Sequence, residues 1–228
     1  MYLTFALTAV LLSTDGASRL RDALGAEGRG DDAAALSALD GLIRDQPTWE
    51  LPRLEAARLR LKTGQKLELA EHDADVARSL APENPRAHYL FALAADDQGH
   101  RVEARRALEM ALIYRAEYGE AQIRLGGLLV AEGDFAAAVK VYRAYVTRNA
   151  NDVGAHVQLA LALERSGQLG PAEASLRALA KTRAGHVVGL RTLAAMLERN
   201  GKSHEAQQVR ASIDGPAKKM RELMPSAH

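Results

Sequence analysis

The pattern that decides the fold is GEAQIRLGGLLVAEGDFAAAVKVYRAYVTRNAND in residues 119–152, written again as VGAHVQLALALERSGQLGPAEASLRALAKTRAGH in residues 153–186. The same residues recur at the same spacing on both sides of these two copies. Glycines recur every 34 residues, at Gly99, Gly133, Gly167 and Gly201. An alanine follows each glycine by five residues, at Ala104, Ala138, Ala172 and Ala206. Self-similarity at a fixed period is the signature of repeat architectures, so the chain is predicted to be a stack of equivalent units.

Three apolar columns precede each glycine in the same register. They are Phe91, Leu125, Leu159 and Leu193; then Ala92, Gly126, Ala160 and Ala194; then Ala95, Leu129, Leu163 and Leu197. Apolar residues within each unit follow helical rather than alternating spacing. The glycine permits a turn, after which a second helix is expected, from about residue 102 to 113 in one copy. Each unit is therefore predicted to be a helix–turn–helix, and the small second column is where the partner helix approaches closely.

Two looser copies come earlier in the chain. One keeps the spacing at Ala57, Leu61, Ala70, Ala74, Ala77 and Pro82, with Gly64 one residue early, and an initial copy is suggested by Gly30, Ala35, Leu39, Leu42 and Pro47. A single unit cannot bury its apolar stripe, whereas stacked neighbours can. We predict an array over 17–214, divided at about 17–50, 51–84, 85–118, 119–152, 153–186 and 187–214.

The repeat resembles the tetratricopeptide repeat (TPR). The matching residues are Leu125, Gly126, Leu129, Gly133, Ala138 and Tyr142, and in the second copy Ala70, Ala77 and Pro82. The resemblance implies an all-α, right-handed superhelical solenoid of about six antiparallel helix pairs. The late proline of the motif is replaced by Ala116, Ala150 and Ala184, so the second helices of those copies are expected to run on or to end in looser turns. Arg210 stands where the motif has a large apolar residue.

Composition agrees with a helical protein and excludes several function classes. The chain is 47% hydrophobic but only 4% aromatic, and its formal net charge is +1. Alanine-rich stretches favour helices. Balanced charge argues against nucleic-acid binding by bulk charge. The absence of cysteine excludes disulfides, thiolate nucleophiles and cysteine-ligated metal sites.

No constellation of residues indicates catalysis. No two histidines have the helical spacing of metal ligands. His88 and His156 occupy one column, where packing is the better interpretation. Gly126 and Gly127 fall inside a predicted helix, not after a strand, so they do not form a phosphate loop. We predict a non-enzymatic protein without cofactor or metal.

Both ends of the chain leave alternatives open. Residues 1–16 include an uncharged stretch, YLTFALTAVLL, which is too short to cross a bilayer. It is interpreted as a first helix, an export segment or an artificial start of the chain. Membrane association is expected only if residues 1–13 act as an anchor; a cytoplasmic location is favoured slightly over the cell envelope. In residues 215–228, Gly215 and Pro216 are expected to end the last repeat before a short capping helix.

The resemblance implies a concave groove lined by the first helix of each pair, which holds a segment of another protein. Its expected apolar centre and flanks are Tyr89, Leu93, Ile123, Gly127, Val130, Val157, Leu161 and Arg191, with Glu55, Leu59, Lys62, Asp96, Glu164, Ala195 and Glu198 around them. Family members that grip a C-terminal carboxylate use Lys and Asn at positions that are here Tyr89, Leu93, Ile123 and Gly127, so that clamp is missing. An apolar groove favours an apolar or amphipathic segment. Alternatively, the protein's own termini cover these residues.

The sequence thus predicts an interaction scaffold or adaptor with a protein or peptide partner and no nucleic acid. One alternative is a bacterial cell-envelope assembly factor, because the repeat number is similar to that of pilotin-type TPR proteins, although those are lipoproteins and this chain has no cysteine. A second is a regulatory TPR segment of a larger enzyme. Self-association is a further alternative.

Overall fold

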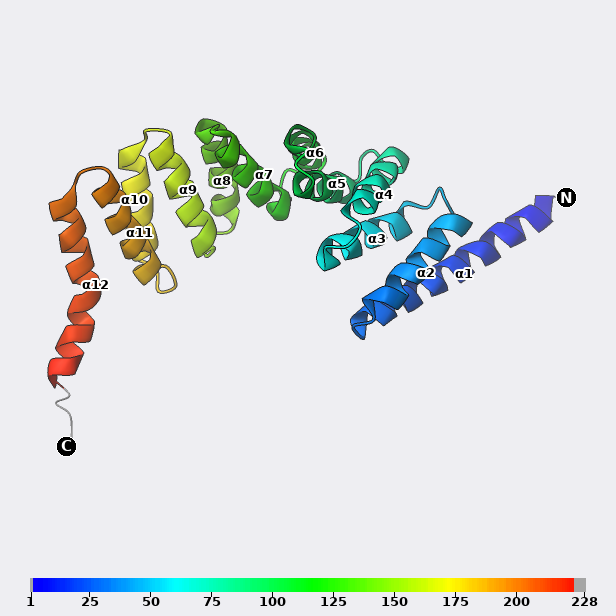
Figure 1. Ribbon diagram of the computed structural model, residues 1–228, viewed down its shortest axis with the longest axis horizontal. Coiled ribbons are helices and arrows are strands. Elements are labelled where there is room, and N and C mark those ends of the chain that lie inside the picture. The colour runs from blue at the N-terminus through cyan, green and yellow to red at the C-terminus, as the bar shows by residue number, and fades with distance from the viewer. Residues whose placement is uncertain (1, 224–228) are drawn as a thin grey trace. The chain divides into compact units, whose positions relative to one another are not determined.

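The computed structural model describes the backbone of residues 2–223 and the side chains of residues 15–213 (Figure 1). The described residues form helices and turns without a strand, which confirms the all-α prediction. The helices are α1 (Tyr2–Gly28), α2 (Asp32–Asp45), α3 (Glu50–Thr63), α4 (Leu67–Leu80), α5 (Pro85–Asp97), α6 (Arg101–Tyr114), α7 (Gly119–Glu132), α8 (Phe135–Arg148), α9 (Val153–Arg165), α10 (Leu169–Ala180), α11 (His186–Arg199) and α12 (Ser203–Leu223).

The chain divides into two compact units, Met1–Ala121 and Gln122–His228. Within the first unit each helix from α1 to α6 packs on the next, and α3 also contacts α5. Within the second unit α8 to α12 pack in the same consecutive way, and α9 also contacts α11. Helix pairs stacked in sequence order are the predicted architecture. We call the odd-numbered helices, which open each pair, the A-helices.

A glycine in the left-handed conformation ends every A-helix. Its φ lies between 65° and 85° at Gly30, Gly64, Gly99, Gly133, Gly167 and Gly201. Each next residue donates its N–H to the carbonyl five residues back, as His100 does to Ala95 at 2.8 Å and Asp134 to Leu129 at 2.9 Å. This Schellman pattern satisfies carbonyls that the helix end would leave unpaired. The predicted turns are confirmed at all six positions.

The repeating columns form the core. The four residues of the first column are at most 6% exposed, and the four alanines that follow the turn glycines are fully buried. Small side chains there let the two helices of a pair lie close together, which explains how a chain with so few aromatic residues fills its interior.

Gly126 and Tyr142 show how one unit varies this packing. The column of Gly126 elsewhere holds Ala92, Ala160 and Ala194, and the column of Tyr142 holds Leu108 and Leu176. A Cβ on Gly126 would lie 2.6 Å from the Tyr142 ring, which is buried. The larger side chain on α8 is therefore accommodated by the missing methyl group on α7.

The structure corrects one expectation about helix ends in part and a second one in full. The helices that lack the late proline do not run on: α6 and α8 end at Tyr114 and Arg148, in the column where α4 ends at Leu80 before Pro82. The N–H groups of Arg115 and Asn149 each donate to the carbonyl four residues back, as that of Ala81 does. These two helices therefore end at the same place without a proline. By contrast, α10 ends two residues earlier in its repeat, at Ala180, and Lys181 and Thr182 donate to carbonyls three residues back, which is the expected looser turn.

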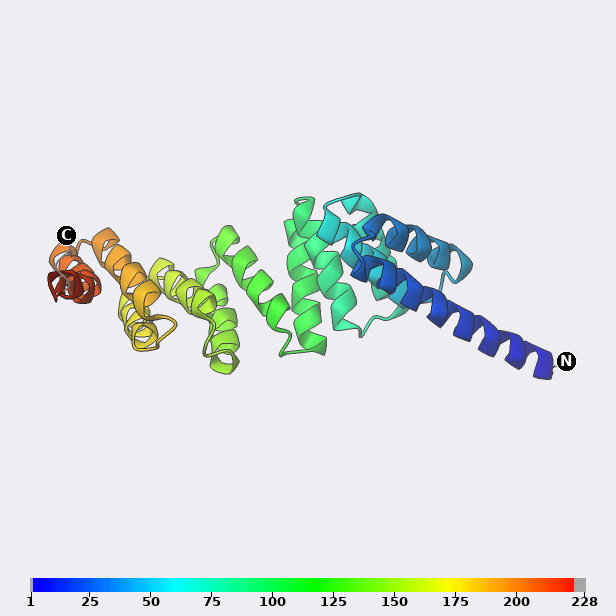
Figure 2. The same ribbon diagram turned by 90° about the horizontal axis from the view of Figure 1, so that it is seen from below.

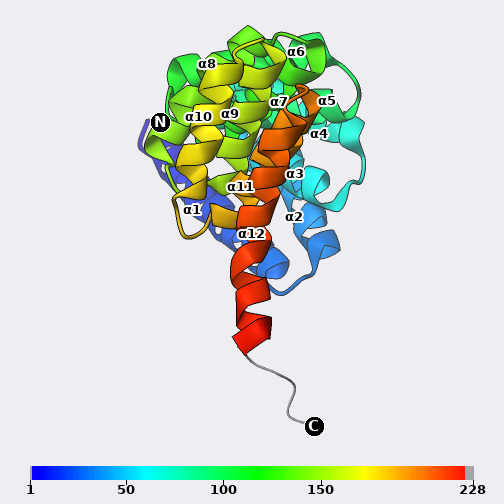
Figure 3. The ribbon, with the colours of Figure 1, turned by 90° about the vertical axis from the view of Figure 1, so that its left-hand side faces the viewer.

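The predicted break at Gly215 and Pro216 is absent, because α12 is one helix from Ser203 to Leu223, and its C-terminal part projects beyond the start of α11 (Figure 3). A proline inside a helix removes one backbone hydrogen bond and often bends a helix without ending it. The side chains expected to cap the array, from Met220 on, lie outside the described ones.

At the other end, α1 includes residues 2–16, so the first helix begins well before the predicted array start at residue 17. Its partner α2 is 14 residues long against 27 in α1, and the N-terminal half of α1 projects beyond it (Figure 2). Among the residues searched, no helix is both long and apolar enough to span a bilayer.

The interior of the second helix pair contains charged residues. Arg60 and Asp73, 4% and 8% exposed in their side chains, form an ion pair, and Arg53 donates to Asp73 at 2.9 Å. Arg60 also bonds Asp40 of α2. Counted from the turn glycines Gly64 and Gly99, Arg60 is the equivalent of Ala95. On the second helix Asp73 is the equivalent of Ala107, so this ion pair replaces two small apolar residues. Paired in this way, the charged residues link α2, α3 and α4.

We predict that Gly126→Ala destabilises the protein by about 1–2 kcal/mol, because overpacking against Tyr142 outweighs the better helix propensity of alanine. In a Tyr142→Leu background, which recreates the Ala–Leu pair of the neighbouring repeats, the same substitution should instead stabilise by about 0.5–1 kcal/mol. Urea unfolding of the four variants measures both effects. Equal effects in the two backgrounds would refute the complementarity.

We also predict that Asp73→Ala costs about 3–5 kcal/mol of unfolding free energy, because it leaves the buried Arg60 and Arg53 without their shared carboxylate. Asp40→Ala is the matched control. It removes a carboxylate from the same guanidinium, but that side chain is 36% exposed, and its loss should cost less than about 1 kcal/mol. Similar decreases in unfolding free energy for both variants, measured by urea unfolding, would contradict the assignment of Asp73 as the essential buried partner of the two arginines.

Candidate functional site

The predicted groove residues all lie on A-helices, but they fall into two groups. Tyr89 and Leu93 lie on α5 in the first unit. The other six lie on α7, α9 and α11 of the second unit: Ile123, Gly127, Val130, Val157, Leu161 and Arg191. The two groups belong to different compact units, so each group is described by itself.

In the first unit, Tyr89 packs against another aromatic residue. The ring centroids of Tyr89 and Tyr118 are 5.0 Å apart with planes inclined by 49°. The Arg115 guanidinium lies 5.1 Å from the centroid of Tyr118. Burial raises the pKa of Tyr118 to about 12, so its hydroxyl stays protonated at neutral pH. Tyr89 and Leu93 are half-buried, which leaves part of each accessible.

The remaining A-helix face of the first unit is a network of ion pairs. Arg58 of α3 bonds Glu27 of α1 and, through Nε at 2.8 Å, Glu55 of its own helix. Glu55 in turn accepts from Arg86 of α5 at 2.7 Å. Both links between helices join residues 31 apart. Each glutamate therefore pairs with an arginine that lies about one helical turn before the equivalent of that glutamate in the next repeat. We call Glu27, Glu55, Arg58 and Arg86 the inter-repeat ion network.

The network shifts the pKa values of its members. The hydrogen bond from Arg58, assisted by Lys62, lowers the pKa of Glu27 to about 2 against the opposing effect of burial. For Glu55, burial favours the neutral acid, but the hydrogen bonds from Arg86 and Arg58 outweigh it and the pKa is lowered. Both carboxylates are therefore ionised across the physiological pH range.

This arrangement corrects one expected flank position and gives two others partners within the protein. Leu59 is fully buried and packs in the core with Ala23, Ala26 and Ala56, so it cannot line a groove. Glu55 belongs to the ion network. Lys62 bonds Glu27 at 3.2 Å and Asp32 at 3.1 Å. The A-helix face of α1 and α3 is thus occupied by the protein's own contacts.

The second unit has a different face. Ile123 and Val130 of α7 and Val157 and Leu161 of α9 are half-buried, while Gly127 and Arg191 are exposed. The apolar residues follow helical spacings of four and seven, which places them along one side of each helix. We call the six predicted residues of this unit the α7–α9–α11 face.

Contacts between α9 and α11 establish their register. Glu164 accepts from Arg199 Nη2 at 2.7 Å and from Asn200 Nδ2 at 2.8 Å. Residues 35 and 36 positions apart are therefore neighbours across these two helices. Arg191 and Ala195 are the repeat equivalents of Val157 and Leu161, 34 residues later on α11.

The sequence interpretation missed Val188. This valine is 42% exposed and lies three residues before Arg191, on the same side of α11. Its signal was the i, i+3 spacing, which extends the predicted positions by one turn toward the start of the helix. Val188 adds exposed apolar surface to the α7–α9–α11 face.

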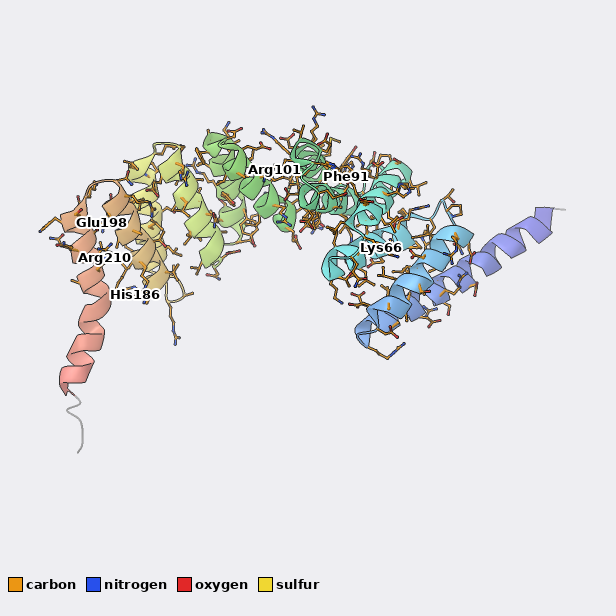
Figure 4. All side chains as sticks on the ribbon, viewed as in Figure 1. Lys66, Phe91, Arg101, His186, Glu198 and Arg210 are labelled. Carbon is orange, nitrogen blue, oxygen red and sulfur yellow. The ribbon has the colours of Figure 1, made fainter. Side chains whose placement is uncertain are left out.

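A hollow between α4 and α5 in the first unit is lined in part by acidic side chains, and two of them, Glu71 and Asp75, already have partners within the protein. Glu71 accepts from Gln98 and contacts His100 at 3.2 Å. Arg78 bonds Asp75 at 2.6 Å and lies 3.8 Å above the Phe91 ring. Figure 4 shows Phe91 and Lys66 in this part of the unit. Within the described residues, no group of side chains is arranged to hold a metal ion.

The histidines singled out by column have packing contacts. His88 is buried, stacks on Tyr114 at 5.5 Å and bonds the Pro82 carbonyl through Nε2 at 2.7 Å. His156 bonds the Ala150 carbonyl in the same way, six residues back, at 3.0 Å. Each ring therefore ties the first turn of an A-helix to the loop before it.

Solved structures of similar fold are TPR proteins. YrrB, described as a TPR protein with an unusual peptide-binding site, aligns with a TM-score of 0.66 and 23% identity, over 75% of this chain and 88% of its own. A tetratricopeptide repeat protein from Parabacteroides merdae aligns with a TM-score of 0.70 and 17% identity, over 88% and 79%. PilW, described as a widely conserved type IV pilus biogenesis factor, aligns with a TM-score of 0.66 and 16% identity, over 88% and 92%.

These likenesses show that the chain has the TPR fold, as its repeat register predicts. No protein-family model matches the sequence, and no curated protein matches it.

The ion network gives a pH dependence that can be measured. Because the pKa of Glu27 is about 2 in the folded protein against 4.5 for an ordinary glutamate, its contribution to stability is complete above pH 4.5 and is lost as pH falls toward 2. At neutral pH the unfolding free energy of the wild type should exceed that of Glu27→Gln by about 1 kcal/mol. Urea unfolding at several pH values should show this difference vanish on acidification. A difference independent of pH would contradict the assignment.

Proposed function

We propose that this protein is a non-enzymatic interaction scaffold that binds an amphipathic segment of another protein on the α7–α9–α11 face. The observation that carries the proposal is the set of half-buried apolar side chains, Ile123, Val130, Val157 and Leu161, on the A-helices of one compact unit. Partly exposed aliphatic side chains gathered in this way favour a protein-binding site over an ordinary solvated surface.

A helical segment suits this face. Its apolar side chains at spacings of three and four residues would contact the valines, leucine and isoleucine, and its polar side would remain in water. Gly127, which has no side chain and is exposed on α7, would let the backbone of such a segment approach closely. The peptide-binding site named in the description of YrrB supports binding of this kind in the same fold.

The likeness to PilW supports a second candidate, an assembly factor for a pilus or secretion system in the bacterial cell envelope. The segment bound on the α7–α9–α11 face would then belong to an envelope component. A regulatory role within a larger enzyme has no specific support in the fold.

The proposal is tested with synthetic peptides about five helical turns long. One carries leucines at i, i+3, i+4 and i+7 with glutamine elsewhere, and a second has the same composition in scrambled order. Fluorescence anisotropy should show binding of the first and not of the second. Ile123→Glu should weaken binding at least about tenfold, because the added carboxylate would be desolvated against the peptide's leucines.

Ala136→Glu is the matched control, because it adds the same charge at an exposed position of α8 in the same unit. This variant should bind like the wild type, and circular dichroism should show both variants folded with similar melting temperatures. Unfolding of Ile123→Glu would assign that residue to the core. Wild-type binding by Ile123→Glu would contradict the proposed face.

A further inference from the structure

Arg191 is an exposed cation on the α7–α9–α11 face, and within residues 15–213 it has no hydrogen bond or ion pair. Its surroundings are apolar. The residues three and four positions away from Arg191 on α11 are all aliphatic, namely Val187, Val188, Ala194 and Ala195, and the valines are 43% and 42% exposed. Along α11, Arg191 is therefore flanked by aliphatic residues rather than by other charges.

The carboxylates of the same face are already paired. Glu164, whose side chain is 12% exposed, accepts from Arg199 and Asn200. Glu198 accepts from Ser203 Oγ at 3.0 Å and from Arg210 Nη1 at 3.2 Å, and Figure 4 shows Glu198 and Arg210 together on α11 and α12. Neither carboxylate is left to neutralise Arg191.

We infer that the segment bound on this face is acidic as well as amphipathic, with a carboxylate beside Arg191 at the end of its apolar stripe; this inference rests on the proposed function. A guanidinium is weakly hydrated and presents a planar fork that fits a carboxylate with two hydrogen bonds. A carboxylate that replaces water there gains an ion pair, whereas a lysine or arginine of a basic segment meets a like charge.

Three peptides that share one leucine stripe and carry glutamate, glutamine or lysine at the other positions test the inference. The wild-type protein should bind the acidic peptide about three- to tenfold more tightly than the neutral one, and the basic peptide more weakly still. Because the pair lies near solvent, the acidic preference should shrink as salt is raised.

Arg191→Glu should reverse the order, so that the basic peptide binds more tightly than the acidic one. This reversal would not follow from a purely structural role of Arg191. Arg143→Glu is the matched control, because it makes the same change of charge at an exposed position of α8. It should keep the wild-type order.

Equal affinity for the three peptides, or an order unchanged by Arg191→Glu, would overturn the inference and leave the proposed function standing. Failure of every striped peptide to bind would overturn the proposed function itself. Light scattering should show a monomer. A dimer that Ile123→Glu dissociates would show that a second copy occupies the face, which would also overturn the inference.

Discussion

The close approach of two helices within each pair is the constraint on which the rest of the structure depends. A left-handed glycine and the hydrogen bond that spans it fix how each A-helix ends and turns. Small residues in the column of Ala92, Ala160 and Ala194 then let the second helix pack closely. Because every pair uses the same geometry, equivalent residues recur in equivalent places, and the positions outside the packed columns are free to differ.

The two units use that freedom differently. On α1, α3 and α5 the A-helix face carries ion pairs between successive repeats, such as Glu27 with Arg58 and Glu55 with Arg86. On α7, α9 and α11 the corresponding face has partly exposed aliphatic residues and the cation Arg191. The same fold therefore carries ion pairs between repeats in one unit and the proposed binding face in the other.

The fold was largely predictable because the columns and glycines depend only on a 34-residue period. The boundary at Gly215 was mispredicted because a Gly-Pro pair is a strong but not decisive signal for a helix end. Leu59 was misplaced because Gly64 comes one residue early, so that counting back 34 residues from Leu93 misses its true equivalent, Arg58, by one. The ion network was not predicted, since a chain in which 26% of residues are charged offers many pairs at suitable spacing. The residues of the candidate face could be predicted from the repeat register. Val188 could be added to them only once the structure showed that its side chain is exposed.

Methyl NMR of the protein with the acidic amphipathic peptide tests the central claim most directly. The account predicts that the methyl resonances of Ile123, Val157, Leu161 and Val188 shift on addition of peptide, while those of the buried Leu176 and of Val146 on α8 do not. Shifts confined to the second helices of the pairs, or no shift at the four named residues under saturating peptide, would contradict it.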